Sequence, residues 1–220
     1  TNLEDKCFAY RAISEKFYHQ GNFANAIEYI NLANSLYNKN LKNNDIFFDE
    51  LNFGEQTSQI INNFPLIKSP DGLRIEKETL QTIIIVNPSN IGTELILNAL
   101  PGTCLGTQTF FSTIFNDFSK NILSLTETDI KDLRLKVLDY SRSVMDSYRL
   151  FISMDPKDFQ QFCFIQLLFP ESKIIHLKTS HLQTILSNYF YTFDPNSPWA
   201  HTISSIEEYL SHHNHLIEFW

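Results

Sequence analysis

The order helix, strand, helix within residues 159–193 constrains the fold more than any other feature of the sequence. An amphipathic run ends at Phe169-Pro170, a short apolar run follows at residues 173–177, and a second helical run begins near Ser180. Because this order is half of a βαβ unit, it predicts a strand of a parallel sheet with a helix before it and a helix after it.

Two further runs have the composition of buried strands. Residues 82–86 read TIIIV, so every one of them is β-branched, and residues 149–152 read RLFI. Each run is followed by a helical pattern, as is the run at 173–177, and we expect the three to be parallel neighbours in one sheet. Residues 103–106 are a further candidate strand. The alternation predicts an α/β fold with a three-layer, P-loop-like parallel sheet.

The remaining segments read mainly as helices separated by turns. Thr126 and Asp129 have the spacing of a capping box, with Asp in the place of the usual Glu, and Ser204 with Glu207 repeats the spacing near the C-terminus. A polar segment at residues 38–45 follows the first two helices and leads into the next one. Helices are predicted over residues 46–63, 94–100, 110–123 and 129–147, before residue 169, after residue 180 and from Ser204 to the end.

Residues 3–38 read as two helices joined by a turn at Gly21-Asn22. Small, aliphatic and aromatic residues recur along them at Tyr10, Ile13, Phe17, Gly21, Phe23, Ala26, Ile30 and Ala33. This spacing resembles one tetratricopeptide (TPR) unit, although an ordinary αα-hairpin accounts for it as well. Because a single repeat cannot bury its own apolar face, we expect the hairpin to pack on the rest of the chain or on further repeats.

A linker is indicated by Pro65, Pro70 and Asp71-Gly72. It divides the chain into a TPR-like helical region, residues 1–70, and an α/β domain, residues 71–220. The 220 residues carry a formal net charge of −8. This charge argues against binding to nucleic acid or to an anionic membrane, since both need clustered Lys and Arg.

The cysteines and histidines suggest neither a disulfide framework nor a metal site. Cys7, Cys104 and Cys163 are far apart and have no CxxC spacing, which favours a reducing, cytoplasmic location and a role in the core. His212 and His215 share a face of the last predicted helix. A solvated helix face accounts for this spacing, so no metal site is predicted. No apolar run approaches the roughly 18 residues that a membrane-spanning helix needs.

The segment 159–193 resembles bacterial sulfotransferases that carry a TPR region in front of the catalytic domain. The shared residues are Leu167-Leu168-Phe169-Pro170, Lys173-Ile174-Ile175, Ser187-Asn188-Tyr189-Phe190 and the later Pro198-Trp199-Ala200. The resemblance implies the sulfotransferase fold and transfer of a sulfuryl group from the sulfonucleotide PAPS to a hydroxyl acceptor. It also implies that the domain is truncated at its C-terminus, because the family's sheet continues with another strand and helix.

The resemblance assigns cofactor-binding positions in two turns. After the strand at 82–86, the family's phosphosulfate turn corresponds to Ser89, Asn90, Gly92 and Thr93. Strand, Gly-containing turn and helix form the layout of a phosphate site, although a plain structural corner has the same layout. After the strand at 173–177, the family's Arg and Ser for the 3′-phosphate correspond to Thr179 and Ser187, and Lys178 is the neighbouring cation.

Charged residues of the family are replaced at several separated positions. Thr179 occupies the position of a family Arg, and Met154 occupies the position of a family Lys. The phosphosulfate turn of this chain also lacks the family's Arg. Gln108 stands at the position of the catalytic base, where a neutral amide cannot accept a proton. The sequence therefore predicts weak or absent sulfuryl transfer.

Three classes of function follow from these observations. The first is a PAPS-dependent sulfotransferase, and the second is a non-catalytic module that binds a protein or peptide partner through the TPR-like region. A P-loop NTPase is disfavoured, because no Gly-Lys-Ser/Thr follows the turn at residues 87–93.

Overall fold

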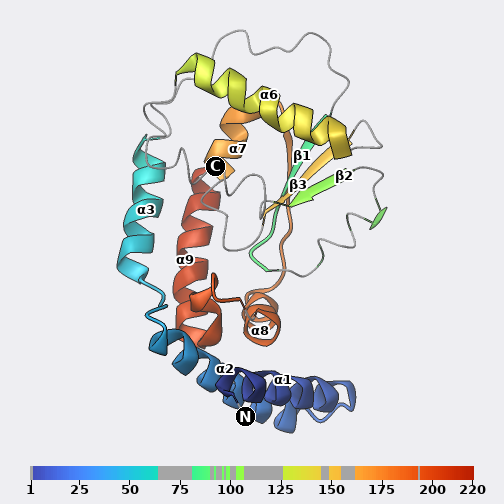
Figure 1. Cartoon of the computed structure of the whole chain (residues 1–220), viewed down its shortest axis with the longest axis vertical. Coiled ribbons are helices and arrows are strands. Elements are labelled where there is room, and N and C mark those ends of the chain that lie inside the picture. Colours follow the sequence, from blue (N-terminus) through green and yellow to red (C-terminus); the bar gives the residue numbers. More distant parts are fainter. Residues whose placement is uncertain are drawn as a thin grey trace. The chain divides into compact units, whose positions relative to one another are not determined.

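The structure is a computed structural model, and its described residues fall into two compact units (Figure 1). Unit 1 comprises Thr1–Phe53 and Ser180–His212, and unit 2 comprises Gly54–Thr179 and His213–Trp220. This grouping differs from the division at residue 70 expected from the linker, which itself lies outside the described residues. The structure describes residues 2–63, 81–89, 92, 96, 98–99, 103–106, 126–144, 149–154, 162–192 and 194–220.

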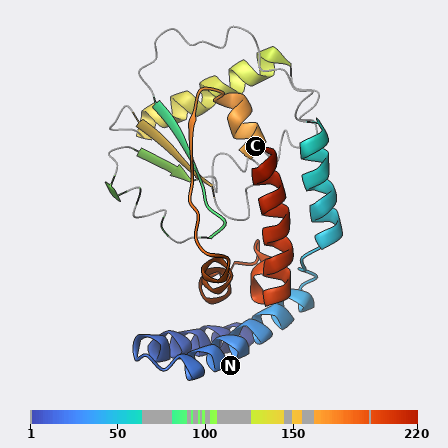
Figure 2. The same ribbon diagram turned by 180° about the vertical axis from the view of Figure 1, so that it is seen from behind.

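Unit 2 contains a four-stranded sheet with the order β2-β3-β1-β4 (Figure 2). Its strands are β1 Gln81–Val86, β2 Thr103–Gly106, β3 Arg149–Met154 and β4 Lys173–His176. β1 pairs in parallel with β3 and with β4, so the predicted parallel neighbours are confirmed, as is the strand at 103–106. β1 lies inside the sheet because its β-branched residues are buried, with Ile84 and Ile85 fully covered. The chain is thus a mixed α/β protein with a small parallel sheet.

Helices α6, Glu127–Val144, and α7, Phe162–Leu168, belong to the same unit. The predicted capping box begins α6: the Thr126 N–H donates to Asp129 Oδ2 at 2.8 Å, and the Asp129 N–H donates to Thr126 Oγ1 at 3.2 Å. The Arg134 guanidinium lies 5.7 Å from the centre of the buried Phe169 ring, which ties α6 to the end of α7. Of the predicted helix at 110–123, nothing lies within the described residues.

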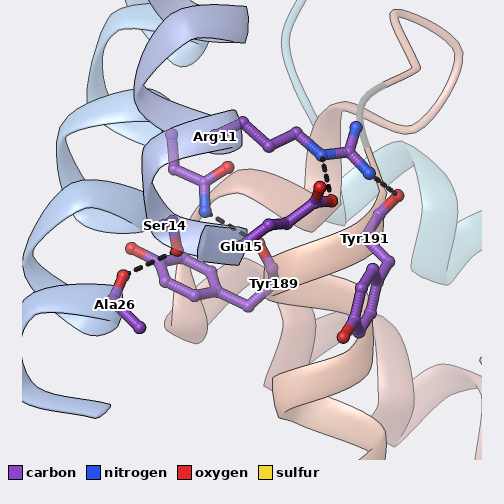
Figure 3. A network of polar contacts seen from close by, with 7 residues as sticks. Arg11, Ser14, Glu15, Ala26, Tyr189 and Tyr191 are labelled. Carbon is purple, nitrogen blue, oxygen red and sulfur yellow. Dashed lines mark hydrogen bonds and ion pairs between the residues drawn. The ribbon is translucent and has the colours of Figure 1, made fainter. Parts of the chain in front are cut away.

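Unit 1 begins with the predicted hairpin, α1 Leu3–His19 and α2 Phe23–Asn43. Gly21 has φ +75° in the turn, a conformation that glycine adopts without strain. The buried Ser14 hydroxyl donates to the Ala26 carbonyl at 2.7 Å, which holds the two helices close together (Figure 3). The end of the second helix expected at Asn38 is wrong, because α2 continues to Asn43 and its Leu41 is buried in a core cluster with Cys7.

Two other predicted helix starts are shifted by local capping. Helix α3 runs from Glu50 to Asn63, four residues later than expected, because Asp49 Oδ1 accepts from the Asn52 N–H at 3.1 Å. Helix α9 runs from Ile203 to Phe219, and Thr202 Oγ1 accepts from the Ser205 N–H at 3.2 Å. The predicted Ser204–Glu207 cap is therefore wrong. No described helix is long and apolar enough to cross a membrane.

The hairpin packs on α8, His181–Tyr191, which comes from the distant end of the chain. Asn34 donates to the Tyr189 carbonyl at 2.9 Å, and Arg11 donates to the Tyr191 carbonyl at 3.3 Å while it lies 3.6 Å from Glu15 (Figure 3). The short 3₁₀ helix η4, Pro198–His201, contacts both α2 and α8. Two side chains of the hairpin thus bind main-chain carbonyl groups of α8.

Candidate functional site

The carboxyl edge of the sheet gathers the turns that follow its parallel strands. Val86 at the end of β1 pairs with Met154 of β3 on one side and with His176 of β4 on the other. β1 comes first in the chain, and β2 and β3 lie on one side of it and β4 on the other, so the strand order reverses at β1. Such a switch point is where open α/β sheets bind ligands.

The turn after β1 is held by its own side chains. Asn87 and Ser89 are buried, and Asn87 Oδ1 accepts both the Ser89 N–H, at 3.0 Å, and the Ser89 hydroxyl, at 3.3 Å. Gly92 follows with φ +91°, and the Ile96 N–H donates to its carbonyl at 3.3 Å. The Ser89 hydroxyl is thus engaged inside the turn, and Gly92 has a positive φ, which glycine adopts without strain.

The turn after β4 lies beside the turn after β1. The Leu177 N–H donates to the Val86 carbonyl at 2.9 Å, and a Cβ placed on Gly92 would lie 3.9 Å from Leu177 Cδ1. Lys178, which is exposed, and Thr179, which is half-buried, come next in the chain. The structure therefore brings four of the residues singled out from the sequence to one edge of the sheet: Ser89, Gly92, Lys178 and Thr179.

The other predicted site residues are not part of this described edge. Ser187 belongs to unit 1, where its buried hydroxyl donates to the Thr184 carbonyl within α8 at 2.9 Å. Asn90, Thr93 and Gln108 lie outside the described residues. The role of Gln108 at the position of a catalytic base stays a prediction.

Two histidines stand close to this edge and carry lowered pKa values. His176 ends β4, and burial, followed by the charge of Lys178, lowers its pKa. The ring of His213, in the second half of α9, lies 6.3 Å from the His176 ring between centroids. Burial lowers the pKa of His213 to about 4. Both imidazoles are therefore uncharged at neutral pH, and neither supplies a fixed positive charge for an anion.

The burial of His213 escaped the sequence analysis, which weighed His212 with His215. The signal was the helical spacing of His213 from Ile206, Tyr209 and Leu216, all of which are buried. His212 lies 4.0 Å from Glu50, and His215 is exposed, as expected for a solvated face. Within the described part of the chain, no group of three or more potential ligands is placed to hold a metal ion.

The chain was compared with protein-family models, with curated proteins and with solved structures, and none of them matches it. The function of the chain is therefore inferred from its own residues and from the geometry of the sheet edge.

Proposed function

We propose that the carboxyl edge of the sheet is a nucleotide-anion site of the sulfotransferase type, with PAPS or its desulfated product PAP as ligand. The observation that carries this proposal is the position of Gly92 beside Leu177, the residue before Lys178 and Thr179, at the switch point of the sheet. A left-handed Gly turn supplies backbone N–H groups to an anion, and Lys178 supplies a positive charge. The proposal includes the three-layer, P-loop-like arrangement of the sulfotransferase fold.

The roles within this site follow the resemblance. The backbone of Asn90, Gly92 and Thr93 would bind the phosphosulfate, and Ser89, whose N–H donates to Asn87 Oδ1, would hold the start of the turn. Lys178 and Thr179 would face the 3′-phosphate. The resemblance gives Ser187 the same role, but its hydroxyl donates to the Thr184 carbonyl within α8 of unit 1. Because the hydroxyls of Ser89 and Ser187 already donate to neighbouring oxygens, backbone amides and Lys178 carry most of the expected binding.

The chemistry proposed for this site is weak. Sulfuryl transfer needs cations around the phosphosulfate and a base for the acceptor hydroxyl. Thr179, Met154 and Gln108 are all uncharged at the positions where the family carries charge. Each lost hydrogen bond to a charged group removes about 1.5–3 kcal/mol, and a lost base lowers the rate by roughly 10²–10⁴-fold. We therefore propose a protein that retains the cofactor layout but transfers little or no sulfate.

PAP binding to the full chain is expected to have a Kd of about 1 mM or weaker, because those cations are lacking. Replacing Thr179→Arg should restore the family's cation and strengthen binding at least tenfold. The matched control is Thr128→Arg, which adds the same charge at an exposed position of α6. Isothermal titration calorimetry measures the Kd of PAP for the unmodified chain and for the two Arg variants.

Two outcomes would contradict this proposal. If both Arg variants strengthen PAP binding equally, the effect is long-range charge and the edge is not the site. If the unmodified chain binds PAP at micromolar Kd and Ser187→Ala weakens that binding, the chain is a competent sulfotransferase.

A second candidate function, a protein-interaction module, is favoured by the surface of the hairpin. Phe23 and Ile27 lie one turn apart on α2 and are 58% and 48% exposed, and the exposed Tyr18 ring lies 5.7 Å from the Phe23 ring between centroids. Large apolar side chains gathered on a surface are typical of binding sites for proteins or peptides.

If this patch binds a partner, replacing Phe23 and Ile27 together with Ser should abolish co-purification of that partner. The matched control is Leu51→Ser, which removes an 80% exposed apolar side chain elsewhere. Affinity purification followed by quantitative mass spectrometry makes the comparison. Equal recovery with the Phe23/Ile27 variant and with the unmodified chain would exclude the patch.

A further inference from the structure

Unit 1 contains an open groove of about 750 Å³ between α2, the end of α8 and the start of α9. Most of the side chains that line it are polar. The lining residues on α2 are Asn31, Ser35, Asn38, Lys39, Lys42 and Asn43, and the others are Tyr189, His201, Thr202, Ile203 and Ser204.

The charge of the groove is opposite to that of the chain. Its lining contains two cations, Lys39 and Lys42, and no carboxylate, whereas the whole chain has a formal net charge of −8. The two lysines stand three positions apart on α2, both are exposed, and among the described residues neither forms an ion pair. Positions three apart share a face of a helix, so both ammonium groups favour an anion bound at this face.

The rest of the groove offers hydrogen-bond donors. Tyr189 donates to Asn31 Oδ1 at 2.8 Å, so the Asn31 amide group has its NH₂ donors remaining. Across from α2, Thr202 Oγ1 accepts a hydrogen bond from the Ser205 N–H at the start of α9. Ile203 and Ser204 lie in the first turn of α9, which contains no acidic residue. The first amides of a helix have no partner within the helix and carry partial positive charge.

The buried wall of the groove adds no charge of its own. Burial lowers the pKa of His201 to about 4, and Asp194, which raises that pKa, is not among the lining residues. His201 Nδ1 lies 3.3 Å from Asn34 Oδ1, and Asn34 in turn donates to the Tyr189 carbonyl at 2.9 Å. This chain of contacts positions Tyr189 and with it the Asn31 amide.

We propose that this groove binds a phosphate monoester. Two lysines together with amide and hydroxyl donors match a compact dianion that has three terminal oxygens. The ester can be the phosphorylated side chain of a partner or a free sugar phosphate. The groove lies wholly in unit 1, so this binding does not depend on the nucleotide site proposed for unit 2.

The test is a titration of the ¹⁵N-labelled full chain with inorganic phosphate, followed by NMR. We expect saturable shifts of the Asn31 side-chain amide and of the Ser204 amide. The double variant Lys39→Gln/Lys42→Gln should weaken binding at least tenfold, because it removes both charge-assisted contacts. The matched control Lys131→Gln/Lys136→Gln makes the same charge change at exposed positions of α6 and should bind as the unmodified chain does.

Further titrations distinguish the two sources of the phosphate ester and distinguish the groove from the site proposed in unit 2. Tighter binding of a blocked Ala-phosphoSer-Ala peptide than of glucose 6-phosphate assigns the ester to a partner, and the reverse assigns it to a free metabolite. Lys178→Gln should leave the groove titration unchanged whether or not PAP binds to unit 2. Equal weakening by the two double variants, or the absence of saturable shifts at Asn31 and Ser204, would overturn the groove proposal.

Discussion

Acidification from pH 7 to pH 4 is expected to destabilise the protein strongly, because two histidines are buried in the uncharged form. Burial lowers the pKa of His201 and of His213 from 6.5 to about 4, whereas the nearby Asp194 raises the pKa of His201 and Asn214 raises that of His213. As pH falls below 6.5, the unfolded chain takes up protons that the folded chain cannot accept. The stability from each histidine is complete above pH 6.5 and is lost down to about pH 4.

The expected loss is about 3 kcal/mol for each histidine. Together this amounts to roughly 6 kcal/mol, a large part of the 5–15 kcal/mol typical of a folded protein. The measurement is the free energy of unfolding from urea titrations between pH 7 and pH 4. His201→Gln and His213→Gln should each reduce the change with pH, and His215→Gln, at an exposed position of the same α9, is the matched control. A free energy that stays constant between pH 7 and pH 4.5 would contradict the burial of these side chains.

Trp199→Ala is expected to lower the free energy of unfolding by about 3–5 kcal/mol. Trp199 is 3% exposed, and its ring stacks on the Tyr209 ring with 3.8 Å between centroids and 6° between planes. Tyr209 is fully buried and also lies 5.8 Å from the Phe53 ring, so the cavity would open in the aromatic core of unit 1.

Two further variants distinguish the loss of the buried stacked contact from the loss of an aromatic ring as such. Trp199→Phe keeps part of the stacked contact and should cost less than Trp199→Ala, and Phe47→Ala removes a ring that is 65% exposed. Chemical denaturation of the three variants gives the comparison. A cost below 1 kcal/mol for Trp199→Ala would show that the site collapses around the missing ring or that Trp199 is not packed in the core.

The site was only partly predictable from sequence. The turn with Gly92 and the pair Lys178-Thr179 were identified from their place after two strand-like runs, and the parallel pairing of β1 with β4 brings them together. The engagement of Ser89 by Asn87 was missed although it is local and although Asn side chains commonly bond the backbone two residues on. The groove was missed as well, since its two sides, at Lys39 and at Ser204, are far apart in the chain.

Short-range interactions determined the local features that the sequence alone predicted. The β-branched run of β1, the left-handed Gly21 turn and the Thr126–Asp129 capping box depend only on residues within a few positions of each other. Propensity and capping act over that range, so the strands, the hairpin and the start of α6 could be predicted without the tertiary structure.

Only the tertiary structure decided which faces are buried and which segments share a unit. Leu41 extends α2 because it packs on Cys7, and the polar residues around it gave no sign of this. Asn34 and Arg11 bind carbonyl groups of α8, more than 150 positions away, and so join the hairpin to residues 180–212. Burial also sets the charge state of His201 and His213, because the free energy of an imidazolium ion depends on the solvent around it and not on its neighbours in sequence.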